Sequence, residues 1–255
     1  MRFRYYYRSE TGNYRQNNQD CAFAMSLRTA CGDAFLGVVC DGMGGLSHGE
    51  LASRAAVDAF SEWFQEEFRY IMSTEMLRDI IFAQWEQLIS GVNSRLRAMS
   101  QEMGCQMGTT LSALLLFAGS YYAAQIGDSR IYQMGCDGAV TQLTRDHSLV
   151  SDMAQAGLMT ENEMSAAARR NVLTRCVGVK EYVCADHYSG ALDKGCFLLC
   201  SDGFYGRLNC AETSGLVARA LSGGNLRKSM DSAVYSRVNS GEKDNVTALA
   251  VRANM

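Results

Sequence analysis

The sequence contains no proline, and a chain of 255 residues without proline must form its turns mainly with glycine, of which it has 24. Histidine is also scarce. His48, His147 and His187 are the only three, and no two of them have the spacing of metal ligands. No Cys-x-x-Cys pair occurs among the ten cysteines. These absences argue against a zinc site made of histidine and cysteine.

The sequence also lacks a strong charge of one sign and a long hydrophobic run. Its formal net charge of −3 provides no basic field that would attract nucleic acid or anionic lipid. The longest apolar run, 111–118, is interrupted by Ser112 and is too short to span a bilayer. The first eight residues mix arginine with aromatic residues, unlike a signal peptide. We therefore expect a cytoplasmic protein that binds neither nucleic acid nor membrane.

What is present indicates one globular unit. Hydrophobic residues make up 47% of the chain and charged residues 20%, which is ordinary globular usage. No internal repeat, linker or low-complexity segment interrupts residues 1–255, so we expect a single domain. Four cysteines lie singly inside apolar segments, and for these a buried reduced thiol is the better interpretation than a disulfide. They are Cys21, Cys40, Cys196 and Cys200.

The hydrophobic pattern predicts strands and helices in an uneven order. Strands are expected over 3–8, 21–27, 34–40, 109–117, 121–126, 130–133, 140–143, 182–189, 196–202 and 246–251. Helices are expected over 49–68, 74–103, 149–157, 160–168, 211–221 and 225–238. Long runs of consecutive strands exclude a simple alternating βαβ fold. They favour an α+β fold, a layered sandwich of antiparallel sheets with helices packed outside.

Three local arrangements follow from the connections. The short link between 21–27 and 34–40 predicts a hairpin, and the strands from 109 to 143 are expected to form a meander. The segment 149–168 is more polar than its surroundings and should be a small excursion from the core. A capping box, Thr160 to Glu163, is expected to open its second helix.

The stretch 35–45 joins an apolar strand to a carboxylate and three glycines. Asp41 ends the expected strand, and Gly42, Gly44 and Gly45 give the backbone freedom to turn sharply beside an ion or a phosphate. Glycines after a strand also occur in simple turns, so this loop alone leaves both interpretations open.

Five carboxylates occupy similar places at expected strand ends, each beside glycine, serine or asparagine. They are Asp20, Asp41, Asp128, Asp202 and Asp244. A single such residue is usually a turn former or helix cap. Five on one rim would repel one another unless cations bound them, and oxygen ligands favour a hard ion such as Mg²⁺ or Mn²⁺.

The motifs around these residues, taken in order, resemble those of the metal-dependent protein phosphatases of type 2C in their bacterial form. They are Arg15-x-x-x-Gln-Asp20, Asp41-Gly-Met-Gly-Gly45, Gly108-Thr-Thr110, Gly127-Asp-Ser-Arg130, Ser201-Asp-Gly203 and Asp244-Asn245. Each motif alone is weak, but six in the same order are specific. The resemblance spans residues 15–251 and implies a four-layer α-β-β-α sandwich with a helical flap over about 146–175.

The resemblance also implies a centre with two Mn²⁺ or Mg²⁺ ions and a third, weaker one. Asp41 would bridge the two ions, and the Gly42 carbonyl would bind one of them. The implied remaining ligands, direct or through water, are Asp20, Asp202 and Asp244, with Asp128 and Asp202 at the third ion. Arg15 matches the phosphate-binding arginine, whose planar fork suits two phosphate oxygens. Arg15, Asp41 and Asp128 are thus the implied catalytic residues.

The implied reaction is hydrolysis of phosphoserine and phosphothreonine on proteins. Two ions about 3.5–4 Å apart lower the pKa of a bridging water, which attacks phosphorus without a phosphoenzyme. The resemblance further implies phosphoprotein substrates, a cognate Ser/Thr kinase among the partners, and a monomer.

Five positions depart from the family pattern. Gln19 replaces a common glutamate, Met43 stands where animal members carry a histidine, and Leu46 replaces a bacterial histidine. Ala168-Arg169 replaces the usual His-Pro pair of the flap. The general acid for the leaving group is therefore unsettled between a metal-bound water near Asp128, which we prefer, and His48. His48 is more simply explained as a solvated or capping residue at a helix start.

Two other functions stay open from the sequence. The first is a catalytically weak module that keeps the fold and binds a phosphorylated partner without hydrolysis. Gln19 and the missing histidines support this interpretation. A metal-dependent nuclease is disfavoured by the acidic balance and the lack of a basic groove.

Overall fold

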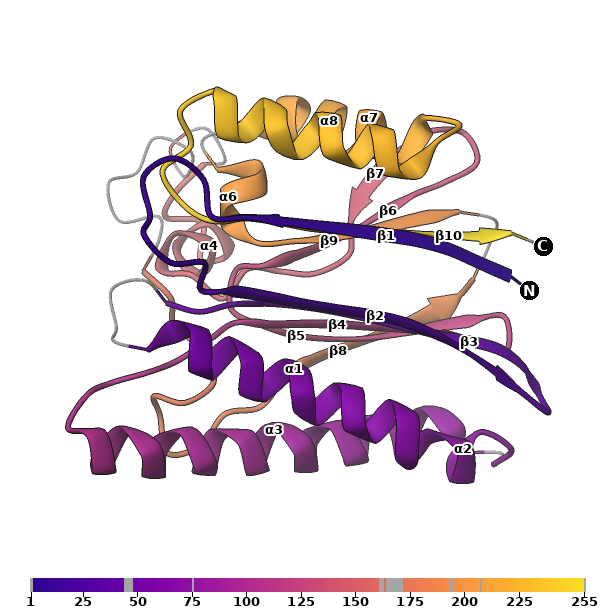
Figure 1. The fold of residues 1–255 in the computed structure, drawn as a ribbon, viewed down its shortest axis with the longest axis horizontal. Helices are drawn as coiled ribbons and strands as arrows, with labels where there is room; N and C mark the ends of the chain where they lie inside the picture. The colour runs from indigo at the N-terminus through magenta and orange to yellow at the C-terminus, as the bar shows by residue number, and fades with distance from the viewer. Residues whose placement is uncertain are drawn as a thin grey trace.

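Two antiparallel sheets lie face to face, and helices cover the outer face of each (Figure 1). The structure is a computed structural model that describes residues 2–43, 48–74, 76–160, 163, 172–192, 195–206 and 208–254. The first sheet has the order β1 (Arg2–Glu10), β10 (Val246–Asn254), β9 (Cys196–Cys200), β6 (Arg130–Met134), β7 (Val140–Gln142). The second has the order β2 (Asp20–Thr29), β3 (Gly32–Asp41), β4 (Leu111–Phe117), β5 (Ser120–Ile126), β8 (Asp186–Ala191). The predicted α-β-β-α sandwich is confirmed.

The helices divide between the two outer faces. The second sheet is covered by α1 (Gly49–Glu66), α2 (Phe68–Ile71) and α3 (Leu77–Met103), and the first by α7 (Cys210–Ser222) and α8 (Leu226–Asn239). Two short helices, α4 (Leu149–Gln155) and α6 (Asp202–Tyr205), lie at the end of the sandwich opposite the chain termini (Figure 1). Among the described residues, no helix is long and apolar enough to cross a membrane.

Burial explains why the central strands are apolar without interruption. In β3 the residues from Ala34 to Cys40 are all buried, and every residue of β4 is buried. One side of these strands packs on the helices and the other on the opposite sheet, so both faces need apolar side chains. On the helix side, Trp63 and Trp85 meet edge to face with ring centroids 5.7 Å apart, which confirms them as core residues.

The expected meander is wrong, because the strands from 109 to 143 belong to two sheets. β4 pairs with β5 in the second sheet, whereas β6 pairs with β7 and β9 in the first. The turn 127–129 carries the chain from one sheet to the other, and its Gly127 has a φ of 94°. Strand patterning predicts that a segment is extended but not which neighbour it pairs with.

Several predicted boundaries also shift. The strand expected over 182–189 begins only at Asp186, and Tyr182 is 83% exposed. The helix expected over 49–68 ends at Glu66, and the one expected from residue 74 begins at Leu77. β9 ends at Cys200, so Asp202 opens the short helix α6 instead of ending a strand.

The predicted excursion is closed at its base. Ser148 and Leu173 form an isolated β-bridge, and the Thr174 N–H donates to the His147 carbonyl at 2.9 Å. The reciprocal bonds of the predicted capping box are present, because Glu163 accepts from the Thr160 N–H at 2.7 Å and Thr160 Oγ1 accepts from the Glu163 N–H. Most of the helix expected over 160–168 lies outside the described residues, as do Gly44, Gly45, Leu46, Ala168 and Arg169.

Candidate active site

Two of the predicted carboxylates face each other across one hairpin. Asp20 is the first residue of β2 and Asp41 the last of β3, and the antiparallel register makes them direct partners. The hairpin predicted from the short link is confirmed. Beyond Asp41, the Gly42 N–H donates to the Gln19 carbonyl at 3.0 Å, so the pairing continues past the carboxylates.

The Gly108-Thr-Thr110 motif holds the backbone of Asp41. Thr110 Oγ1 accepts a hydrogen bond from the Asp41 N–H at 2.9 Å. The Asp41 carbonyl accepts from the Thr110 N–H and from Thr109 Oγ1, each at 2.9 Å. The backbone N–H and carbonyl of Asp41 are therefore both held by the two residues that precede β4.

Gly42 is required by close backbone approach. A Cβ added there would lie 2.2 Å from the Gly49 carbonyl oxygen and 2.7 Å from that of Gln19. Any other residue would therefore push the start of α1 away from the hairpin. Met43 turns its side chain toward Gly108, where an added Cβ would lie 2.1 Å from Met43 Cε.

The Ser201-Asp-Gly203 and Asp244-Asn245 motifs pack against each other and against the N-terminal loop. Ser201 Oγ donates to Asp20 Oδ2 at 2.7 Å, which brings Asp202 next to the hairpin. A Cβ at Gly203 would lie 2.0 Å from the Asn245 carbonyl oxygen. Asn245 Oδ1 accepts from the Gln19 N–H at 2.9 Å, so three segments far apart in the sequence meet behind Asp20.

Asp128 approaches from the turn between the sheets. Its side chain is 8% exposed, and its carbonyl accepts a hydrogen bond from the Tyr205 hydroxyl at 2.8 Å. The neighbouring Arg130 stacks on the Tyr205 ring at 3.6 Å and donates to both oxygens of Asp146, with Nε 2.9 Å from Oδ1 and Nη2 2.7 Å from Oδ2. This largely buried ion pair lies next to the turn that carries Asp128.

Arg15 and Asp244 form an ion pair at the rim. Arg15 Nε donates to Asp244 Oδ1 at 3.1 Å and Nη2 donates to Oδ2 at 2.8 Å. Arg15 is exposed and Asp244 partly exposed. The planar fork of Arg15 thus binds a carboxylate in the two-point geometry that would also fit a phosphate.

Burial and mutual repulsion raise the carboxyl pKa values. Burial is the largest cause throughout, raising the pKa of Asp20 to about 6 and that of Asp128 to about 7. Burial also raises the pKa of Asp41 and of Asp202 well above the usual range. The negative charges of the other four carboxylates add to the effect at Asp41, which shows that the five groups share one region.

The donor set fits a hard cation. Asp20 Oδ1 and Asp202 Oδ1 are buried and have no hydrogen-bond partner, which is costly for a carboxylate unless an ion takes that place. All available donors here are oxygens, as Mg²⁺ and Mn²⁺ prefer. Within the described residues, no three acidic, histidine or cysteine side chains already enclose a single point. An ion would therefore have to draw the carboxylates together.

A cavity of about 350 Å³ opens beside these residues. Asp128, Asp202 and Asp244 line one side of it, and Tyr205 and Leu208 contribute the apolar surface. Its volume is within the range of small-ligand sites.

Sequence reasoning missed the hydrogen-bonding partners of the acidic residues. Ser201, Thr110 and Asn245 were noted only as parts of motifs, and the Arg130–Asp146 pair was not foreseen. Serine and threonine in otherwise apolar strands were the available signal, because a buried hydroxyl must find a partner. His48 is exposed, and its Nδ1 lies 3.7 Å from Glu50 Oε1.

Comparison with known proteins agrees with this geometry. The family model described as Protein phosphatase 2C matches residues 13–233. The protein phosphatase PhpP of Streptococcus pneumoniae is 30% identical over 249 residues, covering 96% of each chain.

Solved structures of related proteins have the same fold. The serine/threonine phosphatase Stp1 from Staphylococcus aureus superposes with a TM-score of 0.85 at 27% identity, covering 100% of this chain and 96% of that one. The catalytic domain of PstP in complex with two manganese ions has a TM-score of 0.79 at 27% identity, covering 98% and 97%. On the strength of its motifs, its fold and these matches, the chain belongs to the protein phosphatase 2C family.

Proposed function

We propose that this chain hydrolyses phosphoserine and phosphothreonine on proteins, in a reaction that depends on Mn²⁺ or Mg²⁺. The observation that carries the proposal is the pair of buried carboxylate oxygens, Asp20 Oδ1 and Asp202 Oδ1, left without a hydrogen bond beside Asp41. Substrates of a cognate Ser/Thr kinase are the expected phosphoproteins. The single-domain organisation, the monomeric state and the cytoplasmic location stay predictions.

Asp41, with Asp20, Asp202, Asp244 and the Gly42 carbonyl, would hold two ions. Asp128 and Asp202 would hold a third. Bound divalent ions would supply Lewis-acid stabilisation of phosphate charge and lower the pKa of coordinated water. The chain itself keeps the carboxylates in place through Thr110 and Ser201.

Arg15 would bind the phosphate group of the substrate. In the structure its fork is occupied by Asp244, so phosphate and Asp244 compete for the same two N–H donors. An ion held by Asp244 would neutralise its charge and favour phosphate in this competition. This coupling makes the phosphate-binding state of Arg15 dependent on the ions.

Replacing Arg15 by lysine should raise KM for a phosphothreonine peptide about tenfold and lower kcat less, because lysine keeps the charge but loses the two-point contact. Steady-state kinetics at saturating Mn²⁺ measure both constants. Arg28→Lys, on an exposed residue of β2 distant from the site, is the matched control. An unchanged KM in the Arg15 variant would remove this residue from phosphate binding.

Activity should require added metal. We expect the purified chain to release phosphate from p-nitrophenyl phosphate and from a phosphothreonine peptide with Mn²⁺, and to lose this activity in EDTA. Malachite-green detection of phosphate measures the turnover. Full activity in EDTA would contradict the proposal. Binding of the phosphopeptide under saturating Mn²⁺ without phosphate release would favour the alternative, a catalytically weak binding module.

A further inference from the structure

His147 holds both polar groups of the Gly127 backbone. The backbone N–H of His147 donates to the Gly127 carbonyl at 2.8 Å, and the backbone N–H of Gly127 donates to the ring nitrogen Nδ1 of His147 at 3.2 Å. His147 is 1% exposed, so water does not compete for these bonds. Gly127 immediately precedes Asp128, so the orientation of the Gly127 backbone determines the position of the Asp128 Cα and Cβ atoms.

The contacts of the ring define its tautomer. A backbone N–H can only donate, so Nδ1 is the acceptor and the proton of the neutral ring is on Nε2. Nε2 lies 3.0 Å from Asp186 Oδ2, to which it donates. Burial also lowers the pKa of His147, which agrees with a neutral ring. Asp186 thus selects the tautomer that can accept from Gly127.

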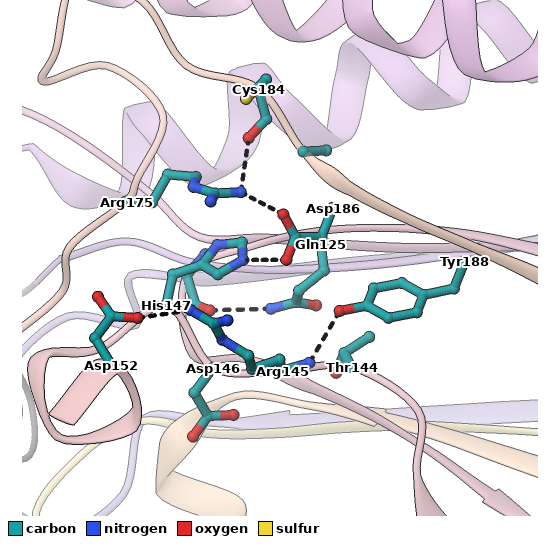
Figure 2. A network of polar contacts seen from close by, with 12 residues as sticks. Gln125, Thr144, Arg145, Asp146, His147, Asp152, Arg175, Cys184, Asp186 and Tyr188 are labelled. Carbon is teal, nitrogen blue, oxygen red and sulfur yellow. Dashed lines mark hydrogen bonds and ion pairs between the residues drawn. The ribbon is translucent and has the colours of Figure 1, made fainter. Parts of the chain in front are cut away.

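Asp186 is itself fixed on its other side. Figure 2 shows its carboxylate between His147 and Arg175, and Arg175 Nη1 donates to Asp186 Oδ1 at 2.5 Å. Arg175 also donates to the Cys184 carbonyl at 3.3 Å. Arg175 belongs to the segment that closes the base of the excursion, so one chain of contacts joins that base to the Asp128 turn.

The Gly127 turn needs such support. Its φ of 94° is a conformation that only glycine adopts readily, and an added Cβ would lie 2.5 Å from Thr110 Cγ2. Gln125 Nε2 provides a second donor to the Gly127 carbonyl at 3.2 Å, whereas within the described residues the Gly127 N–H donates to the His147 ring. Among the contacts described for this turn, the ring of His147 thus fixes the Ile126–Gly127 peptide, and the backbone N–H of His147 fixes the Gly127–Asp128 peptide.

We propose that His147, oriented by Asp186, is a positioning residue that fixes the two peptide groups on either side of Gly127 and so aims Asp128 at the metal site. This inference rests on the proposed function, because it assumes that Asp128 binds a divalent ion. It assigns to His147 no contact with substrate or ion. Its effect should appear first in the weakest ion, the one assigned to Asp128.

Two substitutions at one position separate the two ring nitrogens. In His147→Asn the amide oxygen can replace Nδ1 as acceptor for the Gly127 N–H, whereas in His147→Gln the amide nitrogen can replace Nε2 and reaches Asp186 instead. We expect His147→Gln to raise the dissociation constant of the weakest Mn²⁺ about tenfold, and His147→Asn to raise it less than about threefold. The tighter ions should bind both variants as they bind the wild type.

The measurement is Mn²⁺ binding to the full chain without substrate, followed by the electron paramagnetic resonance signal of free Mn²⁺. His187→Gln is the matched control, since His187 Nε2 pairs with Glu86 Oε1 at 2.7 Å between β8 and α3 but has no described contact with Gly127. His187→Gln should bind every Mn²⁺ ion with the affinity of the wild type. Thermal unfolding establishes that each variant is folded.

Should His147→Gln fail to fold, Asp186→Leu tests the same idea, because the Asp186 side chain is 34% exposed and its loss is better tolerated. Asp186→Leu should weaken the binding of the same Mn²⁺ ion, the one assigned to Asp128. Unchanged Mn²⁺ binding in folded His147→Gln, or in Asp186→Leu where His147→Gln does not fold, would overturn the positioning role. Equal weakening in His147→Asn and His147→Gln would overturn it as well. Normal Mn²⁺ binding by the wild type without turnover would instead count against the proposed phosphatase function alone.

Discussion

Replacing Asp41 by asparagine is expected to lower kcat/KM about a thousandfold and, at the same time, to raise the melting temperature of the metal-free protein. The loss is expected because Asp41 would no longer hold the two proposed ions, which together would supply several kcal/mol of transition-state stabilisation, at 1.36 kcal/mol for each factor of ten. The gain follows because the Asp41 carboxylate is buried among Asp20, Asp128, Asp202 and Asp244. A neutral amide of the same shape removes that repulsion.

Phosphate release at saturating Mn²⁺ and calorimetry in EDTA measure the two effects. The matched control is Asp33→Asn, the same substitution near the opposite end of β3. Asp33 pairs across the hairpin with Arg28. It should leave activity unchanged. Wild-type turnover in Asp41→Asn would contradict the metal assignment, and a lower melting temperature in EDTA would contradict the repulsion.

The metal-free protein should become less stable as pH rises from about 4 to about 7. The pKa of Asp20 rises from 3.8 to about 6, and that of Asp128 from 3.8 to about 7, because burial disfavours the charged carboxylates. Across this range the folded state binds more protons than the unfolded state, so unfolding becomes easier with each pH step. The stabilisation is complete below pH 3.8 and is lost as pH passes the raised values.

At 1.36 kcal/mol per pKa unit, a shift of about two units at Asp20 corresponds to a loss on the order of 3 kcal/mol. Mn²⁺ should reverse this loss of stability, since an ion at 100 times its Kd adds about 2.7 kcal/mol to the free energy of unfolding. Because protons compete with the ion, the rise in melting temperature caused by Mn²⁺ should be small at pH 5 and large at pH 8. Melting temperatures in EDTA that stay constant or increase with pH would contradict this account.

The parts of the fold that depend on local pattern were predictable. β2 and β3 each show the apolar content of a strand and are joined by a short link, so the hairpin follows from the sequence. The helical stripes containing Trp63 and Trp85 predicted two helices packed against a sheet, and both side chains are buried. The order of six motifs predicted the family and hence the sandwich.

What could not be predicted is pairing between distant segments. The strands β5 and β6 are separated by only a short turn, which favours a hairpin, yet they belong to opposite sheets. Hydrogen bonds to His147 hold Gly127 in the turn between these strands, and neither residue's partner can be read from local periodicity. The same holds for Ser201, whose hydroxyl reaches Asp20 across 181 positions.

The candidate site was predictable as a set of residues and not as a geometry. Positions at strand ends predicted that five carboxylates would gather, and the raised pKa of Asp41 reflects that gathering. The ion pair between Arg15 and Asp244 was not foreseen, because both were assigned to other ligands. Their metal and phosphate roles stay predictions until the variants above are measured.

The register of the β2–β3 hairpin has a consequence for tolerated changes in chain length. Asp20 and Asp41 are direct partners because the ten residues of β2 match the ten of β3. One residue inserted within either strand would turn one carboxylate to the opposite face of the sheet. An insertion at the Ala30–Cys31 turn would leave the pairing intact. Relatives of this protein should therefore differ in length at that turn and keep equal strand lengths between it and the two carboxylates.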